Sequence, residues 1–94
     1  MKRYIIERDM PGVGKLSADG LQHARDTSNL ALSETGPGIQ WVQSLITDNK
    51  IYCHYLAENK ELVLEHARRT GFPASKISEV KSILDPVMAT REAA

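Results

Sequence analysis

Two β-type runs joined by two polar residues constrain the fold of this chain more than any other feature. The first run covers residues 39–47 and the second covers residues 50–57, and both are rich in β-branched and aromatic side chains. Asp48-Asn49 between them has the length of a tight hairpin loop. The sequence therefore predicts a β-hairpin over residues 39–57.

The two-residue loop also predicts the register of this hairpin. The expected pairs are Thr47 with Lys50, Leu45 with Tyr52, Gln43 with His54 and Trp41 with Leu56. Because side chains alternate along a strand, these residues share one face of the sheet. The other face takes Val42, Ser44, Ile46, Ile51, Cys53 and Tyr55. Neither set is polar enough to face water, so each face needs a cover.

The segments around the hairpin supply the other elements. The hydrophobic pattern predicts strands over residues 3–9 and 76–84. Capping residues predict two helices: one between Ser17 and Gly36-Pro37-Gly38, and one between Asn59 and Gly71-Phe72-Pro73. The order is β-α-β-β-α-β, the ferredoxin-like arrangement. Right-handed crossovers place both helices on one face of a four-stranded antiparallel sheet, so the predicted fold class is α+β.

Two helices on one face leave the other face of the sheet open. If the helices cover the face of Val42, Ile46, Ile51 and Cys53, the open face presents Trp41, Leu45, Tyr52, His54 and Leu56. A monomer with that exposed patch would tend to associate, which predicts a homodimer packed sheet against sheet, a dimeric α/β-barrel-like assembly. The opposite assignment of the faces stays open, and dimerisation is expected from either one.

Composition narrows the possible partners. The 94 residues suit a single ferredoxin-like domain, with a core over about residues 3–86 and a tail over 87–94. Lys plus Arg and Asp plus Glu both total 12, and this zero net charge argues against binding to nucleic acid. No apolar run approaches the roughly 20 residues that span a membrane. With a single cysteine, Cys53, and no signal-peptide pattern, the expected location is the cytoplasm.

Four segments resemble a bacterial family of small ferredoxin-like proteins whose described branch is nickel-binding and nickel-responsive. They are residues 5–12, 40–44, 50–53 and 65–73, and the similarity covers about residues 3–86. The resemblance implies a dimeric α+β barrel-like fold and nickel as the bound metal. No organic cofactor is expected.

Metal-binding relatives in that family often carry an Asp-x-His pair in the first strand and a His-x-x-x-His pair at the end of the second helix. The residues at the first pair of positions here are Ile6 and Arg8. At the second pair, His66 is present and Thr70 stands four residues later. The chain therefore departs from the family pattern at three of the four positions.

The residues themselves suggest a metal or ligand site built from His54, His66 and Glu7. His54 is expected on the open face, flanked by Tyr52 and Trp41, which we take with it as ligand-binding candidates. Glu7 is the expected acidic partner, and a cluster with Glu79 would form if their faces matched. The alternative interpretation of His66 is a core histidine that is hydrogen-bonded within the fold. The alternative for His54 is a histidine whose hydrogen bonds are made across the dimer interface.

No catalytic residue is assigned. Cys53 is expected to pack as a small core residue, and Gly12-Val13-Gly14-Lys15 fails the phosphate-loop spacing and is interpreted as a turn. We therefore favour a non-catalytic dimer that binds a divalent metal such as nickel in a stress or metal response. The alternatives are a cofactor-free barrel enzyme of the oxygenase or isomerase type, with a cavity lined by Trp41, Tyr52 and His54, and a ligand-free structural or regulatory module.

Overall fold

The predicted order of elements is present in the computed structural model, which describes residues 1–87. The elements are β1 (Lys2–Asp9), the 3-10 turn η1 (Val13–Lys15), α1 (Ala18–Thr35), β2 (Ile39–Ile46), β3 (Lys50–Ala57), α2 (Lys60–Thr70) and β4 (Lys76–Val80). The strands form one antiparallel sheet in the order β2-β3-β1-β4. This arrangement confirms the ferredoxin-like α+β prediction.

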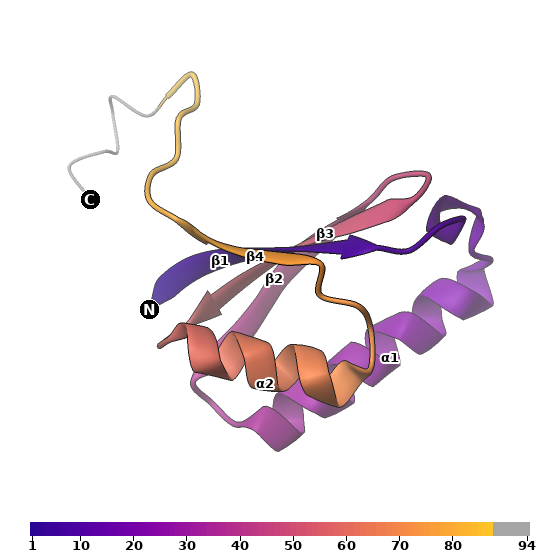
Figure 1. Ribbon diagram of the computed structural model, residues 1–94, viewed down its shortest axis with the longest axis horizontal. Coiled ribbons are helices and arrows are strands. Elements are labelled where there is room, and N and C mark those ends of the chain that lie inside the picture. The colour runs from indigo at the N-terminus through magenta and orange to yellow at the C-terminus, as the bar shows by residue number, and fades with distance from the viewer. Residues whose placement is uncertain (88–94) are drawn as a thin grey trace.

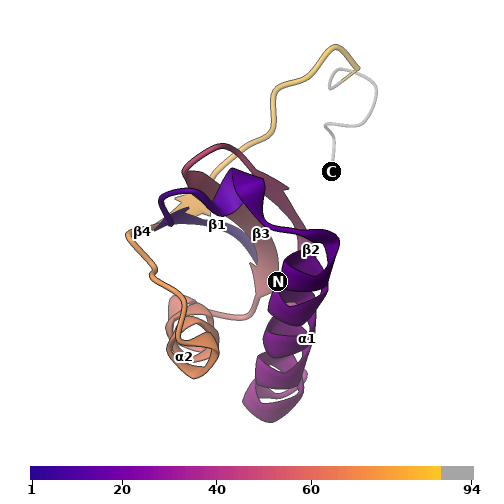
Figure 2. The same ribbon diagram turned by 90° about the vertical axis from the view of Figure 1, so that its right-hand side faces the viewer.

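Both helices lie on the same face of the sheet (Figure 1). Viewed from the side, the sheet curves over them, with α1 beneath the β2 side and α2 beneath the β4 side (Figure 2). The core lies between the layers and contains Tyr4, Ile6, Ile39, Ile51, Cys53, Tyr55, Ala57, Val63 and Ala67. We call this the covered face of the sheet, and the other side the open face.

Local signals account for the helix ends. The Ser17 side chain accepts a hydrogen bond from the backbone N–H of Gly20, and Asn59 does the same for Leu62. Gly71 ends α2 with a φ of 75°, the left-handed conformation that favours glycine. The predicted N-caps at Ser17 and Asn59 are confirmed.

The hairpin contains a β-bulge that the sequence did not predict. Leu45 pairs with Tyr52 and Gln43 with His54, as expected, but the register shifts between Trp41 and Gln43. Val42 is the extra residue, so Trp41 pairs with Tyr55 and its side chain turns to the covered face. The prediction that Trp41 lies on the open face was therefore wrong.

The last strand is shorter than predicted and ends near the N-terminal end of its partner, β1. Val80 pairs with Arg3, so only Lys2 and Met1 remain opposite the residues that follow. β4 ends at Val80, and residues 81–87 lead away from the sheet (Figure 1). Apart from Val87, the predicted tail lies outside the described residues. Across residues 1–87, no helix is long and apolar enough to cross a membrane.

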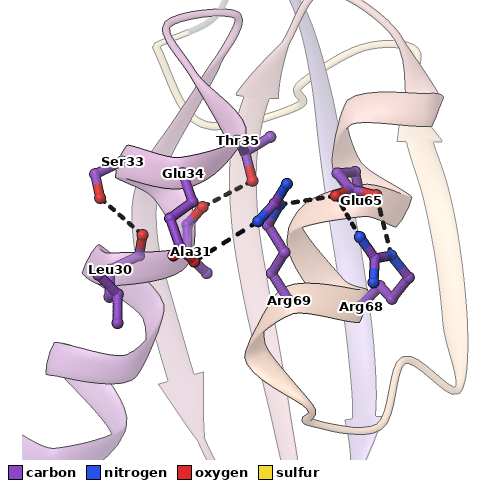
Figure 3. Close-up of polar contacts among 8 residues, drawn as sticks. All are labelled: Leu30, Ala31, Ser33, Glu34, Thr35, Glu65, Arg68 and Arg69. Atoms are coloured by element: carbon purple, nitrogen blue, oxygen red, sulfur yellow. Dashed lines mark hydrogen bonds and ion pairs between the residues drawn. The ribbon is translucent and has the colours of Figure 1, made fainter.

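Ion pairs on the surface link the two helices (Figure 3). Arg69 of α2 lies 3.7 Å from the Glu34 carboxylate of α1 and 2.7 Å from Glu65. Glu65 also accepts hydrogen bonds from Arg68, and this contact is the main reason that the pKa of the Glu65 carboxyl is lowered. All of these side chains are at least a third exposed, so the contacts orient the helices more than they stabilise them.

The glycine-rich segment after β1 is a turn, as predicted, and it packs against the hairpin loop. Gly14 donates its backbone N–H to the Asp48 carbonyl, and Gly12 donates to the Asn49 side chain. At Gly14 the backbones approach so closely that a Cβ would lie 2.8 Å from both Asp48 Cα and the Thr47 carbonyl oxygen. This contact fixes η1 against the hairpin.

Replacing Gly14 with alanine should therefore destabilise the protein by about 1–3 kcal/mol, because the added methyl group meets backbone atoms. The matched control is Gly20→Ala, where a Cβ meets the flexible Leu16 side chain at 3.1 Å in the first turn of α1. That change should be neutral or stabilising by up to about 1 kcal/mol. Urea denaturation measures both, and equal effects of the two substitutions would contradict this view of the turn.

Candidate functional site

An arginine is the largest fully buried side chain on the covered face. Arg8 of β1 is only 1% exposed. Its Nε donates to Cys53 Sγ at 3.5 Å, Nη1 donates to the Pro73 carbonyl at 3.0 Å, and Nη2 donates to Tyr55 Oη at 3.4 Å. Within residues 1–87 no carboxylate lies within ion-pair distance of this guanidinium. A buried positive charge is thus held by neutral acceptors alone.

His66 of α2 continues this polar cluster. It is completely buried, its Nε2 lies 2.9 Å from Tyr55 Oη, and the two rings meet edge to face with centroids 4.9 Å apart. Burial, and the nearby charge of Arg8, lower the pKa of His66 to about 4, while burial raises the pKa of Tyr55 to about 12. Both side chains are therefore neutral at pH 7. Nδ1 of His66 has no hydrogen-bond partner among residues 1–87.

A cavity of about 90 Å³ lies beside Arg8, between α1 and the sheet. Its walls are Leu21, Ala24 and Arg25 of α1, Trp41, Ser44 and Ile46 of β2, Ile51 and Cys53 of β3, together with Arg8 and Phe72. Trp41 donates its indole N–H to Ser44 Oγ at 3.0 Å, and Ser44 in turn donates to Cys53 Sγ at 3.0 Å. These hydrogen bonds fix the indole as one wall of the cavity.

The open face carries a second and different group of polar residues. Glu7 pairs with Tyr52, and His54 pairs with Ile5, so Glu7 and His54 are diagonal neighbours on β1 and β3. Glu7 also lies 3.9 Å from Lys50, which forms a closer contact with Asp9 at 3.5 Å. A histidine and a carboxylate thus share this face with partly exposed apolar side chains.

The structure separates the residues that the sequence suggested as one site. Glu7, Tyr52 and His54 lie together on the open face, whereas Trp41 and His66 belong to the covered face. Glu79 pairs with Tyr4, which places it on the covered side, and its carboxylate contacts Lys81 at 3.2 Å. No group of three His, Cys, Asp or Glu residues able to hold a metal is found within positions 1–87. The cavity expected for a barrel enzyme would lie between the open faces of two copies, and Trp41 does not belong to that face.

The covered face does not suit a divalent cation. His66 has a free Nδ1 among residues 1–87, but the guanidinium of Arg8 is close enough to lower its pKa, in addition to burial. No acidic side chain pairs with this guanidinium within the part of the chain that the structure describes. A metal ion there would meet a fixed positive charge in a low-dielectric environment. Thr70 does not help, because its hydroxyl donates to the Ala67 carbonyl.

Sequence reasoning missed the central role of Arg8. The signal was available in the alternation of β1, where Tyr4, Ile6 and Arg8 share one face and all three are buried. Arginine is almost never fully buried without a partner, so alternation alone did not indicate a buried Arg8. The partners come from Pro73 and Tyr55, which are distant in sequence.

His66 should make the stability of the protein depend on pH. The pKa of His66 is about 4 in the folded chain, whereas an ordinary histidine, as in the unfolded chain, has a pKa of 6.5. Between these two pH values the unfolded chain therefore binds a proton that the folded chain does not. Stability from this source is complete above about pH 7 and falls as the pH drops from 6.5 to 4, by on the order of 3 kcal/mol in total. Urea denaturation from pH 4 to 7.5 measures the slope.

The control for this pH dependence is a pair of glutamine variants. His66→Gln should flatten the slope between pH 6.5 and 4, whereas His23→Gln, at an exposed position on α1, should keep the slope of the parent. A parent-like slope in His66→Gln would show that another group causes the dependence.

Comparison with known proteins now identifies the family. The family described as "Nickel responsive protein SCO4226-like" matches residues 4–80. The crystal structure of SCO4226 from Streptomyces coelicolor A3(2) superposes with a TM-score of 0.70 at 22% identity, over 87% of this chain and 99% of that chain, which supports the shared fold. No curated protein matches the chain. Since the match extends from β1 to the end of β4, the chain belongs to the SCO4226-like family of nickel responsive proteins.

Proposed function

We propose that this chain forms a cytoplasmic, non-catalytic homodimer that binds a divalent transition metal such as nickel on the open face of its sheet. The observation that carries the proposal is the position of Glu7 and His54, which are neighbours on that face. Each chain offers two metal-ligating side chains there. A site of three or four ligands therefore requires a second copy.

The apolar side chains of the open face support dimerisation. Leu45 is 52% exposed, and Ile5, Tyr52 and Leu56 are partly exposed. No element in the described part of the chain covers them, since both helices lie on the other face. Packing two such faces together removes this apolar surface from water and places the same residues opposite each other across a two-fold axis.

The segment after β4 supports the same assembly. Residues 81–84 follow the last residue of β4 that pairs with β1 and carry Ile83, 49% exposed, and Leu84, 85% exposed. Figure 1 shows this segment extending away from its own sheet. An apolar arm of this kind gains partners when a second copy packs alongside, because unpaired strand segments and exposed leucines favour association.

The ligand chemistry of the open face suits a borderline metal. Imidazole nitrogen and carboxylate oxygen both bind divalent first-row metals, and Ni²⁺ binds imidazole well. Around a two-fold axis, two His54 and two Glu7 side chains would supply four ligands. Glu7 would exchange its long 3.9 Å contact with Lys50 for the metal. The nickel-responsive family supports this choice of metal.

The unmodified protein should scatter light as a dimer, at twice the 10.5 kDa mass of the chain, at micromolar concentration. Leu45→Arg should shift it to the monomer, because association would bury an unpaired charge at a cost of several kcal/mol. The matched control is Leu64→Arg on α2, since Leu64 is 49% exposed and lies away from the sheet face. A monomeric parent, or equal behaviour of the two variants, would refute the proposed interface.

Calorimetric titration of tag-free protein with nickel should give one ion per dimer. His54→Ala should lower the affinity at least about a hundredfold, because removal of the histidines takes away two of the four ligands. His23→Ala, at an exposed position on α1, should bind nickel as the parent does. Loss of binding in His66→Ala but not in His54→Ala would place the metal under α2 instead.

A further inference from the structure

We infer that the cavity between α1 and the sheet is a binding site for a small, uncharged apolar molecule, no larger than a benzene ring. This inference is independent of the proposed metal site, which lies on the open face of the sheet. It rests on three features of the cavity: its apolar walls, the hydrogen bonds that occupy the polar atoms around it, and its opening to solvent.

The walls of the cavity are almost wholly apolar. They are built by apolar side chains from α1, from β2 and β3, and from the segment after α2: Leu21, Ala24, Trp41, Ile46, Ile51 and Phe72. A ligand with an apolar surface gains free energy against such walls, because binding removes that surface from water.

The polar atoms around the cavity are occupied by contacts within the protein. The indole N–H of Trp41 donates to Ser44, and Ser44 donates to Cys53. Arg8 is only 1% exposed, and its guanidinium is hydrogen-bonded within the fold. The buried side-chain atom that lacks a partner within residues 1–87 is His66 Nδ1, and His66 does not line the cavity. A buried water needs about two to four polar partners, so this space suits an apolar occupant better than water or a polar ligand.

The cavity has a preformed wall and an opening. The bulge at Val42 turns Trp41 to the covered face, and the hydrogen bond to Ser44 fixes its ring there. Leu21 and Ile46, which are 41% and 43% exposed, lie among the lining residues, so a ligand can enter between α1 and β2.

The volume limits the size of the ligand. An apolar cavity of about 150 Å³ stays dry and binds benzene or xenon. The cavity here has a volume of about 90 Å³ and is partly open, so one benzene ring is the largest apolar group that it holds.

Trp41 provides a direct signal for the test. It is the only tryptophan of the chain, so its indole N–H gives a single NMR resonance that reports on the cavity wall. Benzene added to the full-length protein should shift this resonance saturably, with a dissociation constant of about 1 mM, a value reasonable for so small a ligand. Pyridine has nearly the same shape, but its ring nitrogen would lose a hydrogen bond to water. It should therefore bind at least about tenfold more weakly.

A pair of leucine variants on α1 locates the binding site. Ala24→Leu fills the cavity and should abolish the saturable shift. Ala18→Leu adds the same side chain at an exposed position outside the cavity and should bind benzene as the parent does. Benzene should also raise the thermal unfolding midpoint of the parent and of Ala18→Leu but not that of Ala24→Leu, because only a ligand bound to the folded chain stabilises it.

The inference is overturned by any of three results: no saturable shift in the parent, equal affinities for benzene and pyridine, or parent-like binding in Ala24→Leu. The comparison of benzene with pyridine needs no variant, so the test stays decisive if Ala24→Leu fails to fold. None of these measurements involves nickel, and failure of the apolar site therefore leaves the proposed metal site untouched.

Discussion

The interior of this protein is organised around a positive charge that has no carboxylate partner. Arg8 reaches from the middle sheet strand β1 into the layer between sheet and helices, where its hydrogen bonds go to Cys53, Tyr55 and Pro73. The Tyr55 hydroxyl is also hydrogen-bonded to His66 of α2, which extends the network to that helix. Burial, together with the charge of this guanidinium, lowers the pKa of His66 and keeps its imidazole neutral at pH 7. The same positive charge repels cations from the covered face. These contacts join α2 and the segment after it to the middle of the sheet.

The two faces of the sheet therefore differ in what they can bind. The covered face carries the buried guanidinium of Arg8, which no carboxylate pairs with among residues 1–87, and this charge disfavours a cation. The open face carries Glu7 and His54, which suit a metal cation, within an apolar surface that suits a second copy. One strand, β1, contributes to both, because alternate residues point to opposite sides: Arg8 to the interior and Glu7 to the open face.

Most of the fold could be predicted from the sequence because its signals are local. The hairpin follows from the two-residue loop at Asp48-Asn49, and the helix starts follow from Ser17 and Asn59. The bulge at Val42 could not be predicted, since it depends on how the Trp41 side chain fits between β2 and α1. The end of β4 likewise lies beside a distant segment, the start of β1.

The candidate site was predicted only in part. Alternation along the hairpin placed Tyr52 and His54 on one face, because the side-chain period of a strand is two. Whether Glu7 shares that face was left open by the sequence, and the pairing of β1 with β3 places it there. The role of Arg8 was missed because its acceptors are supplied by tertiary contacts, including a backbone carbonyl after α2. The same fixed charge disfavours a cation beside His66, the family-like histidine.

Crystallography of the nickel-soaked protein, with anomalous scattering at the nickel edge, tests the central claim that the two faces differ in this way. We expect one nickel peak on the two-fold axis of a sheet-to-sheet dimer, within bonding distance of both copies of His54. No nickel is expected beside His66 or Arg8. A nickel peak under α2, or a dimer that leaves the open face exposed, would show that the two faces do not divide their ligands in this way.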